Sequence, residues 1–195
     1  MRPARTTVTL LAGGLLTACA AGTTQITDPP LCRDGEHEAG NGVVLMAQSV
    51  RSATWIPCIR TALPLGWNFN HLDARNGEAR FSLDSDRDGS GAVTVRLDPS
   101  CDTAGATEIP SDRPQMRRLE RVQRVSPRFA GERYYVFPGG CMTFAFSLAG
   151  NNAGEGLALA SAVVGAVTRD DLRGQVREKS GGRLSLDPPP EAGTP

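Results

Sequence analysis

The sequence has little of several residue types that active sites and binding surfaces depend on. Lys179 is the only lysine, His37 and His71 are the two histidines, and aromatic residues make up 5% of the 195 residues. So few histidines exclude metal and catalytic centres that need several imidazole groups. The 21 basic and 21 acidic side chains cancel, so no net positive charge favours nucleic acid as a partner. The hydrophobic fraction of 39% is enough for the core of one domain.

Recognisable catalytic motifs are missing as well. The sequence has no G-x-S-x-G nucleophile turn, no H-E-x-x-H zinc helix and no glycine-rich phosphate loop before a helix. These absences favour a non-catalytic role. The alternative is a hydrolase whose triad is assembled from dispersed residues, with His71 and Asp73 joined by a distant serine.

The first nineteen residues have the order of an export signal. Arg2 and Arg5 give a positive start, and residues 6–16 form an uncharged, largely apolar run. As a helix this run rises about 16 Å, roughly half of a bilayer core, so it is too short for a transmembrane span.

Residues 16–19, with the sequence Leu-Thr-Ala-Cys, resemble the lipobox of bacterial lipoprotein precursors at all four positions. The resemblance implies a diacylglyceryl group on the sulfur of Cys19, cleavage between Ala18 and Cys19 and, in many bacteria, acylation of the new amino terminus. One acyl chain binds a membrane only marginally, whereas two or three hold a protein there for long periods. The alternative is an ordinary secretory signal that is cut at another small residue.

The resemblance also sets the expected organisation of the chain. Residues 1–18 form the signal peptide, and residues 19–30, which are small and polar, form a lipidated tether. A single domain is expected over 31–186, followed by a loose, proline-rich tail over 187–195. The lipid bilayer is then a partner through Cys19, and the domain lies at the extracytoplasmic face of the cell membrane.

Four further cysteines, Cys32, Cys58, Cys101 and Cys141, remain after Cys19. An even number outside the cytoplasm predicts disulfides. The sequence allows more than one pairing. We expect Cys32–Cys58 and Cys101–Cys141, because joining neighbours closes the loops at the smallest entropic cost. A zinc cluster is disfavoured, because there is no C-x-x-C and the histidines are isolated.

Alternation of apolar and polar residues predicts two hairpins. One joins residues 81–84 and 93–97 across a turn-rich loop, and the other joins 134–137 and 142–148 across Pro138-Gly139-Gly140. Proline followed by glycine is typical of a type II turn, whose third position needs a positive φ.

The apolar spacing becomes helical after residue 150, at Leu157, Ser161, Val164 and Thr168. Asn152 and Glu155 are a predicted capping pair for this helix. A second helix is expected to begin at Thr168, with Asp171 completing a capping box, and to stop by Gly181-Gly182.

Strands followed by helices predict an α+β fold. Antiparallel hairpins form a sheet or small sandwich, C-terminal helices follow, and two disulfides staple the domain. An all-β sandwich with peripheral helices is the alternative. Residues 43–53 fit either a helix or a buried strand, and that choice stays open.

The segment 84–89 spells D-x-D-x-D-G, the opening of a calcium loop. Its carboxylates are Asp84, Asp86 and Asp88. Val95 stands where the closing glutamate belongs, and Arg87 adds a positive charge, so any calcium is expected to bind in the millimolar range. The alternative is a polar β-turn whose aspartates accept hydrogen bonds from their own backbone. No other cofactor is predicted.

Arginines crowd one stretch that contains only two acids, Glu120 and Glu132. They are Arg113, Arg117, Arg118, Arg121, Arg124, Arg128 and Arg133. Guanidinium groups bind phosphate and carboxylate, so lipid headgroups or anionic wall polymers are predicted ligands of the central five of these arginines, from Arg117 to Arg128. The alternative is a solvated face paired with the acidic loop.

Trp55 and Trp67 are candidates for a sugar-binding surface, since indole rings stack on sugar faces; core packing beside a disulfide is the alternative. Three stretches resemble uncharacterised secreted proteins of GC-rich bacteria, and no activity follows from that resemblance. They are Leu83-Asp84-Ser85-Asp86-Arg87, Cys101-Asp102 and Tyr134-Tyr135-Val136-Phe137-Pro138-Gly139-Gly140-Cys141.

These features together predict a membrane-anchored surface lipoprotein with a non-catalytic binding or accessory role in the cell envelope. Its expected partner is an envelope polymer or a membrane protein. The alternatives are the envelope hydrolase described above and a calcium-stabilised surface module.

Overall fold

The computed structural model describes residues 23–32 and 38–187. The predicted signal peptide, Cys19 and His37 lie outside the described residues, as does the predicted tail after Asp187.

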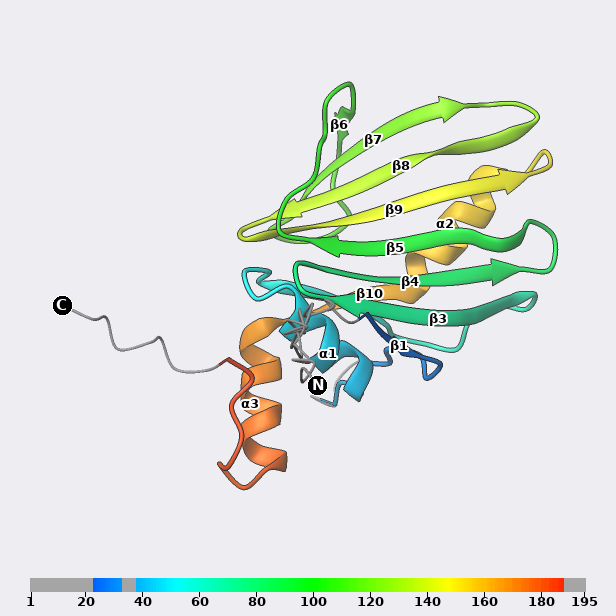
Figure 1. The fold of residues 1–195 in the computed structure, drawn as a ribbon. Helices are drawn as coiled ribbons and strands as arrows, with labels where there is room; N and C mark the ends of the chain where they lie inside the picture. The colour runs from blue at the N-terminus through cyan, green and yellow to red at the C-terminus, as the bar shows by residue number, and fades with distance from the viewer. Residues whose placement is uncertain (1–22, 33–37, 188–195) are drawn as a thin grey trace, which may run out of the picture.

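Within the described residues, eight antiparallel strands form one sheet in the order β1-β3-β4-β5-β9-β8-β7-β6 (Figure 1). Its strands are β1 (Thr24–Ile26), β3 (Trp67–Arg75), β4 (Glu78–Ser85), β5 (Gly89–Asp98), β6 (Thr107–Ile109), β7 (Arg117–Arg124), β8 (Arg128–Phe137) and β9 (Gly140–Ala149). A second sheet pairs β2 (Trp55–Ile59) with β10 (Val164–Thr168), and the helices are α1 (Asn41–Ser49), α2 (Ala153–Val163) and α3 (Arg169–Lys179). The predicted α+β class is confirmed.

Both predicted hairpins are confirmed. β4 pairs with β5 so that Phe81 faces Val95, and β8 pairs with β9 across the Pro138-Gly139 turn. Gly139 has a φ of 73°, as the predicted turn requires. A Cβ at Gly139 would lie 1.9 Å from the carbonyl oxygen of Ser52, so the turn also packs closely against the segment that follows α1.

One face of the large sheet carries the core. Alternate side chains such as Phe81, Val95 and Phe144 are fully buried there, in one cluster with Met46 of α1 and Leu157 of α2. The α1 and α2 helices and the β2–β10 pair cover this face (Figure 1). The opposite face, to which every second residue of a strand points, is mainly polar and carries one small apolar cluster of Leu119, Tyr134 and Cys141.

The open choice for residues 43–53 resolves as helix over 43–49, within α1, and residues 50–53 form the turn that follows it. Its buried residues Val43, Met46 and Ala47 recur at helical spacing. The buried guanidinium of Arg169 donates hydrogen bonds to the carbonyl oxygens of Ala47 and Val50, each at 2.6 Å. Because the last carbonyls of a helix lack partners within it, Arg169 both ends α1 and joins it to α3.

The predicted first C-terminal helix is too long. α2 ends at Val163, and Val164 and Thr168 lie in β10, whose backbone pairs with β2. Tertiary pairing with a second strand therefore overrides the helical spacing. The predicted capping pair is also wrong, because Asn152 occupies the N-cap without a side-chain hydrogen bond there.

The predicted second helix is confirmed as α3. The Thr168 hydroxyl oxygen accepts a hydrogen bond from the backbone N–H of Asp171 at 3.1 Å. The helix ends just before Gly181 and Gly182, both of which have positive φ. The sequence signals at both ends of α3 therefore predict the structure correctly.

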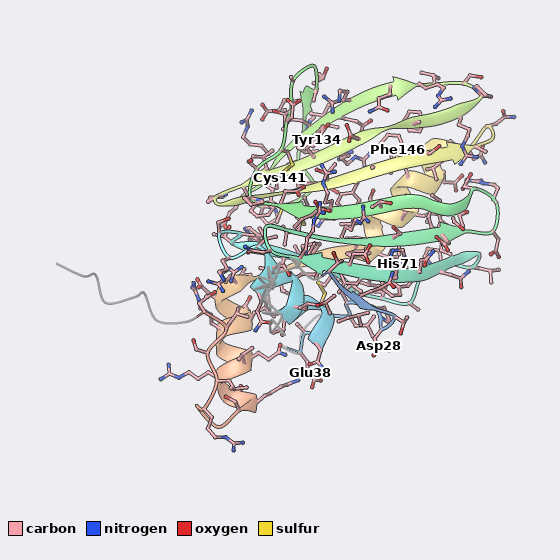
Figure 2. All side chains as sticks on the ribbon, viewed as in Figure 1. Asp28, Glu38, His71, Tyr134, Cys141 and Phe146 are labelled. Carbon is pink, nitrogen blue, oxygen red and sulfur yellow. A yellow bond between two sulfur atoms is a disulfide. The ribbon has the colours of Figure 1, made fainter. Side chains whose placement is uncertain are left out.

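Both expected disulfides are present. Cys32–Cys58 and Cys101–Cys141 span 26 and 40 residues. Loops of this size correspond to about 3–4 kcal/mol of stabilisation each when the chain entropy of the unfolded state is counted. Cys141 lies on β9 beside Tyr134 of β8, on the polar face of the sheet (Figure 2).

The sheet begins inside the segment that was predicted to be a tether. Thr24–Ile26 form β1, which pairs with residues 72–74 of β3, so the sheet begins at residue 24 and not after residue 30. At the other end, Leu186 is buried and the carboxylate of Asp187 pairs with Arg169 at 2.7 Å. None of the helices in the described ranges is apolar and long enough to span a bilayer.

Candidate functional site

The Trp67 cleft lies at the end of the sheet where β3 begins, β4 ends and α2 starts. Trp67 pairs with Ser85 at the first position of the β3–β4 ladder. The preceding turn is closed by a hydrogen bond from the N–H of Trp67 to the carbonyl of Pro64, and Gly66 supplies its φ of 81°. The N–H of Asp86 donates to the carbonyl of Gly66 at 2.8 Å, which fixes the two loops together.

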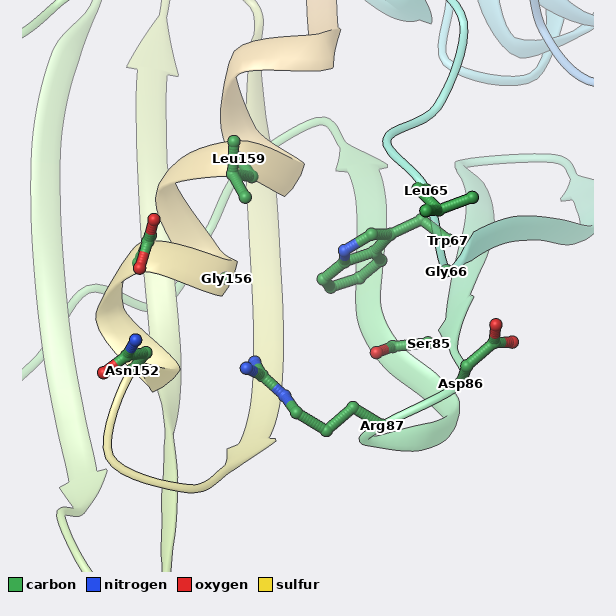
Figure 3. A pocket seen from close by; sticks show the side chains of 10 residues that line it. Leu65, Gly66, Trp67, Ser85, Asp86, Arg87, Asn152, Gly156 and Leu159 are labelled. Carbon is green, nitrogen blue, oxygen red and sulfur yellow. The ribbon is translucent and has the colours of Figure 1, made fainter.

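The cleft combines an aromatic wall with polar groups of both charges. Its volume is about 320 Å³, and the indole of Trp67 points from β3 towards α2 (Figure 3). Arg87, Asn152 and Glu155 provide a guanidinium, an amide and a carboxylate. Leu65 is fully exposed at the rim, and the side chain of Leu159 on α2 is 47% exposed. Exposed apolar side chains beside polar groups are typical of ligand sites.

Arg87 is held in the cleft from two sides. Its Nη2 lies 3.3 Å from the carboxylate of Asp88, and its guanidinium lies over Gly156 of α2. A Cβ on Gly156 would be 2.9 Å from Nη2, so the glycine leaves the space that the guanidinium fills.

The Asp88 side chain is fully buried beneath Arg87. Burial alone raises the pKa of Asp88, but hydrogen bonds from the N–H of Ala149, from Arg87 and from the Ser85 hydroxyl outweigh it and lower the pKa. The charged carboxylate thus ties the β4–β5 turn to the end of β9, because Ala149 donates to it at 2.6 Å.

The three predicted calcium ligands have different protein partners. Asp84 accepts hydrogen bonds from the N–H of Gly91 and from Asn70, whereas Asp86 lies at the cleft and Asp88 is buried. The N–H of Asp88 donates to the carbonyl of Ser85, which is the pattern of the polar β-turn. In the ranges that the structure covers, no three His, Cys, Asp or Glu side chains are grouped as metal ligands. Calcium binding stays a prediction.

The predicted anion-binding arginines point to both faces of the sheet edge. Alternation along β7 places Arg117 and Arg121 on the polar face and Arg118 on the core face. Their carboxylate partners are, in the same order, Glu108 at 2.6 Å, Glu132, and Asp112 at 3.6 Å.

The other two predicted arginines lie away from these. Arg124 is exposed next to a β-bulge, and Arg128 donates hydrogen bonds to the carbonyl oxygens of Asp88 and Ser147. The stretch therefore forms several ion pairs instead of one continuous cationic patch.

The two tryptophans do not share a surface. Trp67 lines the cleft just described, whereas Trp55 lies on β2 and lines a separate cavity with Arg113.

His71, on β3 (Figure 2), uses both ring nitrogens within its own strand. Nε2 lies 3.2 Å from the carboxylate of Asp73, and Nδ1 lies 2.7 Å from the amide oxygen of Asn70. The predicted histidine–aspartate pair therefore exists, but in this arrangement no ring nitrogen is left to activate a serine hydroxyl.

The sequence alone missed most of the cleft. The sequence predicted no ligand-binding role for Arg87, and it predicted Asn152 and Glu155 as a capping pair. The usable signal was the turn residue Gly66 directly before Trp67, which predicts an aromatic side chain at a strand end. No pattern within a few residues of Trp67 predicts that α2 packs beside it. Comparisons with protein-family models, curated proteins and solved structures found no match.

Proposed function

We propose that this protein is a lipid-anchored, extracytoplasmic binding module that holds a carbohydrate of the cell envelope in the Trp67 cleft. The observation that carries the proposal is the half-buried indole of Trp67, which forms one wall of a cleft of about 320 Å³. Such a volume lies at the lower end of the range for ligand pockets, about 300–1,000 Å³.

The chemistry of the cleft suits a sugar unit. A pyranose ring offers an apolar C–H face for stacking and a rim of hydroxyl groups for hydrogen bonds. Trp67 and Leu159 provide apolar contact, while Arg87, Asn152 and Glu155 provide both donors and acceptors. Charges of both signs line the cleft, which favours a sugar of low charge density over a strongly charged polymer.

The position of the cleft relative to the predicted anchor supports the same function. Residues 20–23 separate Cys19 from β1, and a chain of that length reaches at most about 18 Å. β1 begins opposite Ala74 near one end of β3, whereas Trp67 lies at the other end, about 23 Å away along the strand. A lipid on Cys19 would hold the Ala74 end near the membrane and leave the cleft directed away from it.

The two disulfides fit an oxidising compartment, which is where such an anchor would keep the domain. A binding role also agrees with the position of His71, whose contacts lie within β3 and not in the cleft.

Tryptophan fluorescence tests the proposal. In the Trp55→Phe variant Trp67 is the only tryptophan, so its emission reports on the cleft alone. We expect soluble glycan strands prepared from peptidoglycan to change this emission in a saturable manner. The Trp67→Ala variant should no longer be retained on insoluble peptidoglycan, whereas the Trp55→Phe variant should still be retained. Equal retention of Trp67→Ala and the unmodified protein, with both folded by circular dichroism, would overturn the proposal.

A further inference from the structure

A second cavity lies where the end of α2 and strand β10 meet the loop over residues 110–116. Its volume is about 240 Å³, and Trp55, Arg60, Asp112 and Arg113 are among the residues that line it. None of its lining residues contributes to the Trp67 cleft.

Arg113 is fixed in this cavity by contacts that carry no negative charge. Its Nη2 donates hydrogen bonds to the carbonyl oxygens of Val164 at 2.6 Å and Ser161 at 3.4 Å. The guanidinium carbon lies 4.4 Å from the ring centre of Tyr135 and 5.5 Å from that of Phe144. Stacking on two rings and bonding to two carbonyls hold the charged group in one orientation.

The positive charge of Arg113 lacks a direct counter-ion. Among the described residues, no carboxylate lies within ion-pair distance of it. Burial lowers the pKa of Arg113 and outweighs Tyr135 and Asp112, which raise it, while the neighbouring guanidinium of Arg60 lowers it further. Asp112 is close, but its carboxylate accepts a hydrogen bond from the Tyr135 hydroxyl at 3.0 Å and lies 3.6 Å from Arg118.

Arg60 reaches the cavity because Gly165 has no side chain. A Cβ on Gly165 would lie 1.9 Å from Nε of Arg60, so the arginine lies flat across β10 at this point. Trp55 lies on β2, three residues before Cys58, which is the residue that pairs with Gly165. Its indole adds an apolar wall to the cavity.

We propose that this cavity binds a small oxyanion, a phosphate or carboxylate group, between Arg113 and Arg60, with Trp55 against its organic part. A partly buried guanidinium without an ion-pair partner is less stable than a paired one, and an anion that enters the cavity would provide that partner. Guanidinium groups match the geometry of both oxyanions. The site is independent of the glycan proposed for the Trp67 cleft.

Thermal unfolding in inorganic phosphate, in acetate and in chloride at equal ionic strength tests the site and distinguishes a tetrahedral from a planar anion. We expect phosphate or acetate to raise the melting temperature above its value in chloride, in a saturable manner. Calorimetric titration of the same anion should show at least a tenfold weaker affinity for Arg60→Gln, because one charged hydrogen-bond donor is lost.

Arg117→Gln is the matched control, because Arg117 is an exposed arginine that pairs with Glu108 outside the cavity. It should bind the anion as the unmodified protein does. Arg113→Lys, which keeps the charge but loses the planar fork, should also weaken binding. Equal melting temperatures in all three salts, or equal losses for Arg60→Gln and Arg117→Gln, would overturn the proposal.

Discussion

The guanidinium of Arg87 lies over Gly156, so close that a Cβ on the glycine would be 2.9 Å from Nη2. This contact joins the β4–β5 turn to the first half of α2, two segments far apart in the sequence. Glycine is unfavourable inside a helix by about 1 kcal/mol relative to alanine. Glycine is present at position 156 because the guanidinium of Arg87 occupies the space that a Cβ would take.

Gly156→Ala is expected to displace Arg87 from the Trp67 cleft. The far end of a flexible side chain can move at small cost, so the gain in helix propensity offsets much of the strain, and stability should change by less than about 1 kcal/mol. Glycan binding should fall, as measured by Trp67 fluorescence in the Trp55→Phe background.

Gly154→Ala is the matched control on the same helix, since nothing lies within 4 Å of a Cβ at that position. It should raise the free energy of unfolding by about 0.5–1 kcal/mol and leave binding intact. If Gly156→Ala and Gly154→Ala bound the glycan equally well, Arg87 would have no role in the cleft.

Asp88→Asn is expected to destabilise the fold by about 1.5–3 kcal/mol, because a buried carboxylate loses its charge-assisted hydrogen bonds. The pKa of Asp88 is lowered in the folded state, so its contribution is complete above about pH 4 and is lost as the pH falls through the folded pKa. Chemical unfolding of the variant and of the unmodified protein between about pH 6 and about pH 2 measures both the loss of stability and its dependence on pH.

Asp86→Asn provides the control, since Asp86 is an exposed aspartate in the same turn. Asp86→Asn keeps Asp88, so its free energy of unfolding should still fall as the pH falls through the folded pKa of Asp88. A pH profile of Asp88→Asn as steep as that of the unmodified protein would exclude Asp88 as the titrating group.

Both tyrosines of the chain should resist ionisation in the folded protein. Burial, followed by a 2.7 Å hydrogen bond to Glu132, raises the pKa of Tyr134 to about 12, and burial also raises the pKa of Tyr135. The stability that this confers is present below the ordinary tyrosine pKa of about 10 and is lost as the pH rises through the folded values.

Ultraviolet absorbance of the phenolate group measures this directly. The native protein should show less phenolate near pH 10 than the same chain in denaturant, which should titrate at about that pH. A native phenolate signal with a midpoint near pH 10 would show that these hydroxyl groups are solvated.

Cys19→Ala should prevent lipid attachment. The precursor is expected to remain uncleaved at this site and to take up no radioactive palmitate. A Cys32→Ser, Cys58→Ser double variant, which keeps Cys19, should retain the label even though its fold is weaker. Unchanged labelling of Cys19→Ala would refute the anchor while leaving the binding sites to be tested on their own.

The sequence predicted features whose causes lie within a few residues. Alternation specified the β4–β5 and β8–β9 hairpins, and Thr168 with Asp171 specified the start of α3, because a strand face and a helix cap are formed locally. The segment from Val164 to Thr168 was misread, because its strand conformation depends on hydrogen bonds to β2, more than a hundred residues earlier.

The sequence by itself predicted an α+β fold and an export signal, and loop entropy favoured the cysteine pairing that the structure shows without excluding the other pairings. Only the tertiary structure brought Trp67, Arg87 and α2 to one cleft. It also placed Asp112 within ion-pair distance of Arg118 and left Arg113 without an ion pair among the described residues. The physical reason is the range of the interactions. Side-chain periodicity and loop entropy act along the chain, whereas a cavity and its charge balance depend on groups from distant segments that meet only in the folded protein.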